Sequence, residues 1–250
     1  MPPEIVLAAA RQSVSAVLAA ANGQLTGAYL HGSAVLGGWT PRSDVDLLFV
    51  VPDDLGDLDP VAAALAGSAF PGGGLECSVV SERQAGAAAN PPWPFLLHVA
   101  ARESGGPRIV RGAGHPGDRD LLIHYVVCRA AGYAVHGPPA AELIGEVPRP
   151  AILGYLADEL DWGQEHGTEP YLVLNACRAL TYCRDGATIS KVAGGQEALR
   201  CRLGPAALIA GALDQQTGRR EAEKPSPEAR QFALATASLL RDAARTGKAG

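Results

Sequence analysis

The sequence has little positive charge and no long apolar segment, and both absences restrict its class. Its 21 Lys and Arg residues are outnumbered by 26 Asp and Glu residues, which gives a formal net charge of −5 at pH 7. Proteins that wrap nucleic acid are usually basic, so we expect no nucleic-acid partner. No run of about eighteen apolar residues occurs, so we expect no membrane-spanning helix.

Cysteine patterns typical of disulfide frameworks or zinc sites are also missing. The cysteines number five, and no C-x-x-C motif occurs, which indicates reduced thiols. The histidines are scattered without the spacing of metal ligands. The first residues lack a basic segment followed by an apolar one, so we expect a cytoplasmic protein without a secretory signal.

The order of predicted helices and strands indicates two domains in this chain of 250 residues. The first part has predicted strands at 27–31, 44–51 and 75–80, and predicted helices at 4–21, 33–36, 58–67 and 119–135. After a proline-rich linker, helices are predicted at 151–166, 170–184, 190–200, 205–217 and 226–245.

We therefore expect an α+β fold with two domains. Residues 1–148 are expected to form a mixed β-sheet with flanking helices, and residues 149–250 a helical bundle. The segment 84–118 is rich in Pro and Gly and gives no clear pattern. A cleft between domains is a common place for a binding site.

A pair of acids begins the predicted strand 44–51. Asp44 and Asp46 alternate along the strand, so their side chains share one face, with Cα atoms roughly 6–7 Å apart. Carboxylates this close repel each other unless a cation lies between them, and Mg²⁺ is commonly shared by carboxylates and phosphates. Solvated acids on an edge strand are the alternative. The apolar run Leu47 to Val51 indicates a central strand and favours the metal site.

Small residues upstream of the acids suit a phosphate. Gly32 has no side chain, so the backbone can approach a phosphate closely. Ser33 begins a predicted short helix, whose N–H groups can bind a phosphate oxygen together with the Ser33 hydroxyl. Ser43, which precedes Asp44, is also a candidate for nucleotide binding, with a plain turn residue as the alternative.

The segment HGSAVLGGWTPRSDVDLLFVV, with Gly-Ser ten residues before Asp-x-Asp, resembles the nucleotidyltransferase superfamily of the DNA polymerase β type. It is more closely similar to the aminoglycoside adenylyltransferases that modify streptomycin and spectinomycin. The resemblance covers most of the chain and is weakest in the middle and at the tail. It implies Mg²⁺-dependent transfer of AMP from ATP to a hydroxyl of a small cationic antibiotic, with two Mg²⁺ ions when ATP is bound.

Glu76 is a third acid, in the predicted strand 75–80. In the adenylyltransferases that the chain resembles, the glutamate of this strand is the catalytic base, whereas in the wider superfamily a third acid can bind metal. We favour the base, which takes the proton of the acceptor hydroxyl. A metal ligand and a solvated strand face are the alternatives.

Two cations, Arg178 and Lys191, lie 13 residues apart in the helical half. Arg178 is on the inward side of the predicted helix 170–184, and Lys191 lies at the start of the next helix. The resemblance, carried here by LNACRALTYCRDGATISK, implies that both grip the ATP phosphates. An ordinary ion pair for Arg178 and a surface position for Lys191 are the alternatives.

An acidic stretch precedes Arg178 and includes one aromatic residue. By helical spacing, one face carries Asp158, Asp161, Trp162 and Glu165. A cationic aminocyclitol suits carboxylates and an aromatic wall, so these residues, together with Tyr171, are candidates for acceptor binding. A solvated acidic helix face is an equal alternative.

We therefore expect a monomeric aminoglycoside O-adenylyltransferase that confers antibiotic resistance. Ungapped comparison places Glu159 and Gln164 where streptomycin-accepting relatives have Trp and Asp, and Tyr171 where they have His. Spectinomycin is therefore favoured over streptomycin. The alternatives are a nucleotidyltransferase that acts on another small molecule or on a protein, and a catalytically inactive binding module.

Overall fold

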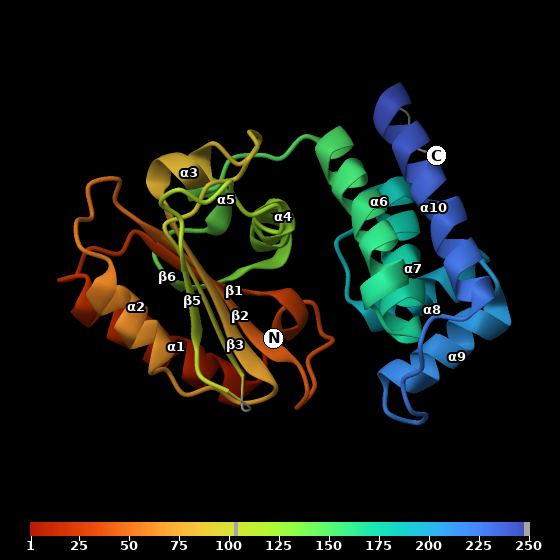
Figure 1. The fold of residues 1–250 in the computed structure, drawn as a ribbon, viewed down its shortest axis with the longest axis horizontal. Helices are drawn as coiled ribbons and strands as arrows, with labels where there is room; N and C mark the ends of the chain where they lie inside the picture. Colours follow the sequence, from red (N-terminus) through yellow and green to blue (C-terminus); the bar gives the residue numbers. More distant parts are fainter. Residues whose placement is uncertain (103–104, 248–250) are drawn as a thin grey trace. The chain divides into compact units, whose positions relative to one another are not determined.

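The computed structural model describes residues 1–102 and 105–247, and the chain divides into two compact units. The N-terminal unit, Met1–Val147, contains a β-sheet with flanking helices, and the described part of the C-terminal unit, from Pro148, is helical (Figure 1). The α+β fold expected from the sequence is thereby confirmed. Within the described residues, no helix combines the length and apolar character that crossing a membrane requires.

The sheet of the N-terminal unit has six strands in the order β5-β4-β3-β2-β1-β6. They are β1 (Gly27–His31), β2 (Asp44–Val51), β3 (Gly74–Ser81), β4 (Leu97–Arg102), β5 (Arg108–Arg111) and β6 (Tyr133–His136). Strands β2 and β3 pair in parallel, and the remaining pairs are antiparallel. The two strands that carry the predicted acids are therefore central neighbours.

One face of the sheet is apolar and is covered by α1 (Glu4–Ala20) and α2 (Asp59–Ala66) (Figure 1). Its core includes Leu47 and Phe49 of β2 and Cys77 and Val79 of β3, all at most 1% exposed. Full burial of a Leu or Phe side chain contributes roughly 1.5–3 kcal/mol. Because side chains alternate along a strand, this packing directs the acids of β2 and β3 to the opposite face.

The opposite face is partly covered by three short helices (Figure 1). These are α3 (Glu82–Gly86), α4 (Leu121–Ala131) and α5 (Ala140–Leu143), of which α4 and α5 pack against β1 and α3 packs against β3. The turn η1 (Gly32–Ala34) directly follows β1 and packs against β2. The part of this face that carries the acids lies beside these helices.

The structure corrects the predicted helix at 119–135. Helix α4 ends at Ala131, and the chain turns at Gly132 into strand β6, which pairs with the free edge of β1. Tyr133 and Val135 favour extended backbone, and the available strand edge outweighs the helical pattern. The unassigned segment 84–118 contains α3, β4 and β5.

The C-terminal unit contains five helices in its described residues. They are α6 (Arg149–His166), α7 (Glu169–Asp185), α8 (Lys191–Cys201), α9 (Ala206–Gln216) and α10 (Pro227–Thr246). Helix α10 packs against α6 and α7 around an apolar core. Ser190 caps α8 by accepting a hydrogen bond from the Ala193 N–H at 3.2 Å. This cap fixes Lys191 at the first position of the helix.

Candidate active site

The predicted acids lie on one face of the sheet, on adjacent strands. Asp46 of β2 is directly opposite Glu76 of β3, and Asp44 is opposite Gly74. All three acids are half-buried, whereas Val45 and Leu75, which point to the other face, are at most 1% exposed. The structure therefore brings Asp44, Asp46 and Glu76 together.

Gly32 makes room for one of these carboxylates. It follows β1, whose last residue His31 is opposite Asp46, and it has a left-handed backbone with φ +65°. A Cβ atom on Gly32 would lie 1.9 Å from Oδ2 of Asp46. A larger residue at position 32 would collide with the Asp46 side chain, so Gly32 is linked to Asp46 by geometry.

Ser33 and Ser43 lie on either side of the chain segment that leads into β2. Ser33 is half-buried in η1. The Ser43 hydroxyl accepts a hydrogen bond from the Thr40 N–H at 3.0 Å and closes the turn before β2. Ser43 thus has a turn role, and its contact with a nucleotide stays a prediction.

Asp44 has a cationic partner that the sequence did not reveal. Arg102, at the end of β4, forms an ion pair with Asp44 across Gly74. A Cβ atom on Gly74 would lie 2.7 Å from both side chains. The hydrogen bond to Asp44 raises the pKa of Arg102 above its ordinary value. Buried Leu97, Val99 and Ala101 alternate with the less buried His98, Ala100 and Arg102, and this period of two is the signal that could have placed Arg102 on this face.

Asp44 and Asp46 are the predicted metal ligands. Across residues 1–102 and 105–247, no group of three or more His, Cys, Asp or Glu side chains is arranged to hold a metal ion. The chemistry of the pair nevertheless fits a hard cation, because both donors are carboxylate oxygens and Gly32 keeps space beside Asp46. Metal binding by Asp44 and Asp46 therefore stays a prediction.

His31 is a buried histidine close to the acids. Its ring lies 4.7 Å from that of His124 on α4, measured between centroids. Burial holds the pKa of His31 well below its ordinary value, and the neighbouring His124 lowers it further. The lowered pKa favours the neutral form of the His31 ring beside Asp46.

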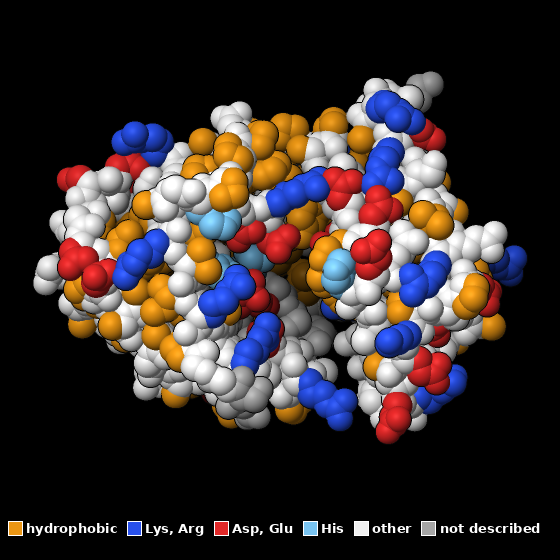
Figure 2. Space-filling view, viewed as in Figure 1, with side chains coloured by type: hydrophobic (Ala, Val, Ile, Leu, Met, Phe, Trp, Pro, Cys, Tyr) orange, Lys and Arg blue, Asp and Glu red, His pale blue; other side chains and the backbone are white. Residues whose placement is uncertain are grey.

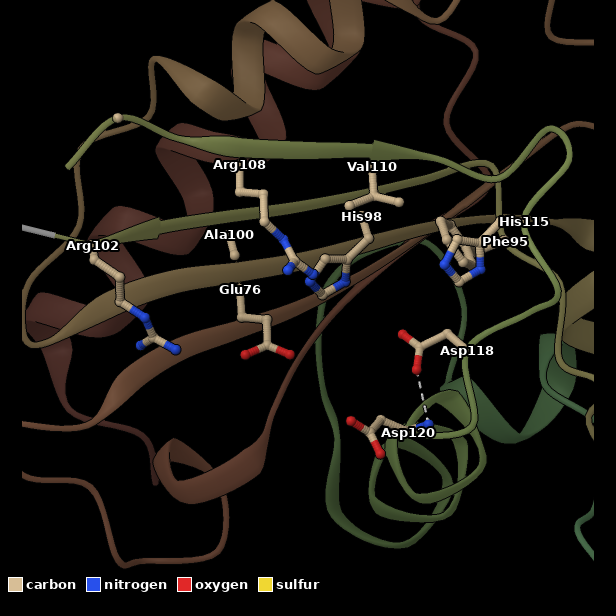
Figure 3. A pocket seen from close by; sticks show the side chains of 11 residues that line it. Glu76, Phe95, His98, Ala100, Arg102, Arg108, Val110, His115, Asp118 and Asp120 are labelled. Atoms are coloured by element: carbon tan, nitrogen blue, oxygen red, sulfur yellow. Dashed lines mark hydrogen bonds between the residues drawn. The ribbon is translucent and has the colours of Figure 1, made fainter. Parts of the chain in front are cut away.

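A pocket of about 500 Å³ lies on the same face, with Glu76 in its wall (Figure 3). Its wall comes from β3, β4, β5 and the segment that leads into α4, and its charged side chains are Glu76, Arg102, Arg108, Asp118 and Asp120. Figure 2 shows acidic, basic and histidine side chains close together on the drawn face of the N-terminal unit. This volume is within the usual range for small-molecule sites.

The pocket residues other than Glu76 were missed by the sequence analysis. Arg102 and Arg108 come from strands in the segment 84–118, and Asp118 and Asp120 come from irregular backbone. A short Asp-x-Asp before a helix reads as a solvated turn, so no sequence signal distinguishes Asp118 from other turn aspartates.

The C-terminal unit brings together several of its predicted site residues. The Lys191 ammonium lies 4.5 Å from the centroid of the Tyr171 ring, and the Tyr171 hydroxyl donates a hydrogen bond to Glu159. Arg178 is half-buried and donates to Asn175 at 3.2 Å. Burial lowers the pKa of Arg178, while Tyr155, Tyr171 and Glu159 oppose that shift. A guanidinium remains charged in any case.

The acidic face of α6 has a structural partner. Arg241 of α10 bonds to Asp158 at 2.8 Å and also to Asp161, which joins the two helices. Trp162 is half exposed, stacks on His166 and meets Tyr171 edge-on, and Glu165 is exposed. Acceptor binding by these residues stays a prediction. Asp158 and Asp161 also hold α6 against α10 through Arg241.

Comparisons with known proteins agree with this geometry. The nucleotidyltransferase domain family matches residues 16–71, which include Gly32, Ser33, Asp44 and Asp46. The aminoglycoside adenylyltransferase C-terminal domain family matches residues 142–238, which include Arg178 and Lys191.

A solved structure has a similar fold. The crystal structure of spectinomycin adenyltransferase AAD(9) from Enterococcus faecialis with ATP and spectinomycin has a TM-score of 0.61 and 17% sequence identity. The match covers 93% of this chain and 97% of that chain. No curated protein sequence matches significantly. The chain joins a nucleotidyltransferase domain to the C-terminal domain of the aminoglycoside adenylyltransferases, and it is a nucleotidyltransferase of the aminoglycoside adenylyltransferase family.

Proposed function

We propose that the protein transfers AMP from ATP to a hydroxyl group of an aminocyclitol antibiotic, with spectinomycin as the favoured acceptor. The observation that carries this proposal is the row of Asp44, Asp46 and Glu76 on one face of adjacent strands. The similarity in fold to a spectinomycin adenyltransferase supports the choice of acceptor.

The N-terminal unit supplies the groups that hold the nucleotide at its reacting end. In the proposal Asp44 and Asp46 hold Mg²⁺, two ions when ATP is bound, and these ions offset the negative charge of the phosphates. The backbone of Gly32 and the hydroxyl of Ser33 contact a phosphate oxygen. Because Gly32 packs directly against Asp46, a phosphate at this turn lies beside that carboxylate.

The C-terminal unit supplies positive charge for the triphosphate. Arg178 and Lys191 neutralise the phosphates and stabilise the charge that develops on the departing pyrophosphate. Tyr171 contacts the ammonium of Lys191 and so restricts where that charge lies.

Glu76 acts as the general base in this reaction. Its carboxylate takes the proton as the O–H bond of the acceptor hydroxyl breaks. The hydroxyl oxygen bonds to the α-phosphorus, and the bond from that phosphorus to the bridging oxygen of pyrophosphate breaks. AMP is then attached to the acceptor, and pyrophosphate leaves with the bonding electrons.

The proposal is tested by pyrophosphate release from ATP and Mg²⁺ with spectinomycin, streptomycin and other aminoglycosides. We expect release that depends on spectinomycin, is lost in Asp46→Asn, and is unchanged in the exposed control Glu142→Gln. Release without AMP attached to any drug of the panel would refute the acceptor class. No release with any drug would refute the reaction.

A further inference from the structure

The pocket beside Glu76 contains a carboxylate, Asp118, that the proposed reaction does not yet use. We propose that this pocket binds the acceptor and that Asp118 binds an ammonium group of it. The inference rests on the proposed function, and it identifies the acceptor as a hydroxylated amine that binds through a carboxylate of the N-terminal unit.

The charge of the pocket favours a cation. Its wall carries the carboxylates of Glu76, Asp118 and Asp120 and the guanidinium groups of Arg102 and Arg108. Among the described wall residues three carboxylates therefore outnumber two guanidinium groups, and this excess of negative charge favours a cationic ligand.

Two of the candidate acids on α6 are less available for the same task. Asp158 and Asp161 both bind the guanidinium of Arg241, which offsets one of their two negative charges and engages both carboxylates in the contact between α6 and α10. A cationic acceptor that replaced Arg241 would have to break the link between α6 and α10. The pocket beside Glu76 requires no such rearrangement.

The backbone around Asp118 is held in place by defined contacts. The Asp118 N–H donates to the carbonyl of Trp93 at 2.9 Å. Gly117, with φ +110°, packs so closely on Pro92 that a Cβ atom would lie 2.0 Å from the Pro92 carbonyl oxygen. One oxygen of Asp118 accepts the Asp120 N–H at 3.0 Å. Asp118 is therefore positioned before a ligand binds.

Asp118 and the proposed base Glu76 line the same pocket. In Figure 3 the carboxylates of Glu76 and Asp118 point toward the same space, with the Phe95 and His115 rings at its edge. Those two rings meet edge-on at 4.9 Å between centroids. A small ring compound can therefore present a hydroxyl to Glu76 while its ammonium contacts Asp118 and its apolar side meets the rings.

The test is Asp118→Asn in the full chain, with Asp57→Asn as the matched control. Asp57 accepts the Asp59 N–H at 2.9 Å, the same turn contact that Asp118 makes before α4, but it does not line the pocket. Asparagine keeps the turn bond in both variants and removes only the charge. The measurements are KM for spectinomycin, KM for ATP and melting temperature.

We expect Asp118→Asn to raise KM for spectinomycin about 10- to 100-fold, the scale of a lost hydrogen bond to a charged group, with KM for ATP unchanged. Asp57→Asn is expected to match the wild type. Equal spectinomycin KM values in the two variants overturn the inference while leaving the proposed function intact. A wild type without AMP transfer to any drug of the panel overturns both.

A second measurement is needed if Asp118→Asn has a lower melting temperature than the wild type. Carbodiimide labels accessible carboxylates, and saturating spectinomycin is expected to protect Asp118 but not Asp57 in the wild-type protein. Labelling of Asp118 that spectinomycin leaves unchanged overturns the inference without any variant.

Discussion

Arg102 and Asp44 form an ion pair across Gly74, the residue that lies between them on the intervening strand. The guanidinium therefore occupies one of the carboxylates that we propose as magnesium ligands. Binding of Mg²⁺ by Asp44 must displace this contact, so the ion pair and the metal compete.

Removal of the guanidinium is expected to favour the metal. Arg102→Ala should lower the Mg²⁺ concentration that half-saturates ATP binding about two- to five-fold, since exposed ion pairs contribute roughly 0.2–1 kcal/mol. Arg102→Lys keeps the charge and should stay close to the wild type. Calorimetric titration of ATP at stepped Mg²⁺ concentrations measures this, and a higher Mg²⁺ requirement in Arg102→Ala would contradict the competition.

Replacement of the proposed base separates chemistry from binding. Glu76→Gln should lower turnover by roughly 10²-fold or more, the usual contribution of a general base, with the affinity for ATP retained. Single-turnover kinetics measure the rate of the chemical step, and titration of the same sample with ATP measures the affinity. Turnover close to that of the wild type would remove Glu76 from the base role.

The ring beneath Lys191 is expected to act on nucleotide binding. Tyr171→Leu should raise KM for ATP by roughly two- to five-fold, as a cation–π contact contributes about 0.5–1 kcal/mol. Tyr171→Phe keeps the ring, loses the hydrogen bond to Glu159 and should leave KM for ATP near the wild-type value. Initial rates at varied ATP and varied spectinomycin distinguish the roles, and a change confined to spectinomycin would make Tyr171 an acceptor residue instead.

The link between α6 and α10 is expected to serve stability. Arg241→Gln should reduce the free energy of unfolding by roughly 0.5–1 kcal/mol, a modest value because both partners are partly exposed. Arg245→Gln, which breaks the more exposed pair with Asp242, is the control and should show little change. Urea unfolding tests this. If Arg241→Gln changed the KM for spectinomycin but not the stability, Asp158 and Asp161 would be acceptor-binding residues instead.

Tyr29 is expected to make the fold sensitive to alkali. Its buried hydroxyl donates to the Pro138 carbonyl at 2.9 Å, and burial raises the pKa of Tyr29 to about 12. The unfolded tyrosine ionises near pH 10, so this stabilisation is complete below pH 10 and is lost as the pH rises towards 12. At pH 11 the loss is roughly 1.4 kcal/mol.

Urea unfolding at pH 8 and pH 11 measures that loss. Tyr29→Phe should be less stable than the wild type at pH 8 by about 1 kcal/mol, for the missing hydrogen bond, but should lose less stability on going to pH 11. The exposed Tyr133→Phe should follow the wild type at both pH values. Identical alkaline losses in all proteins would refute the role of Tyr29.

Local patterns of the sequence were sufficient for the elements that carry the acids. The alternation of side chains placed Asp44 and Asp46 on one face, and the apolar run from Leu47 marked β2 as central, as the structure shows. The helices of the C-terminal unit were also predicted close to their observed ends, because their helical periodicity is strong and proline or glycine residues mark their ends.

Contacts between distant segments were beyond such patterns. Arg241 lies 80 residues after Asp161, and no local rule links them. Arg102 meets Asp44 only because Gly74 lacks a side chain between them. The helix predicted at 119–135 was too long because the helical periodicity continues past Gly132. In the structure the chain after Gly132 forms β6, which pairs with the free edge of β1. Long-range pairing decided each of these cases.

The parallel register of β2 and β3 has a consequence for how this enzyme can vary. The connection at residues 52–73 runs back along the sheet, so insertions in its loops can change its length without moving Asp46 away from Glu76. A deletion of a single residue inside either strand would instead exchange the two faces downstream of it, burying acids and exposing valines. A variant that still folds therefore keeps Asp46 beside Glu76.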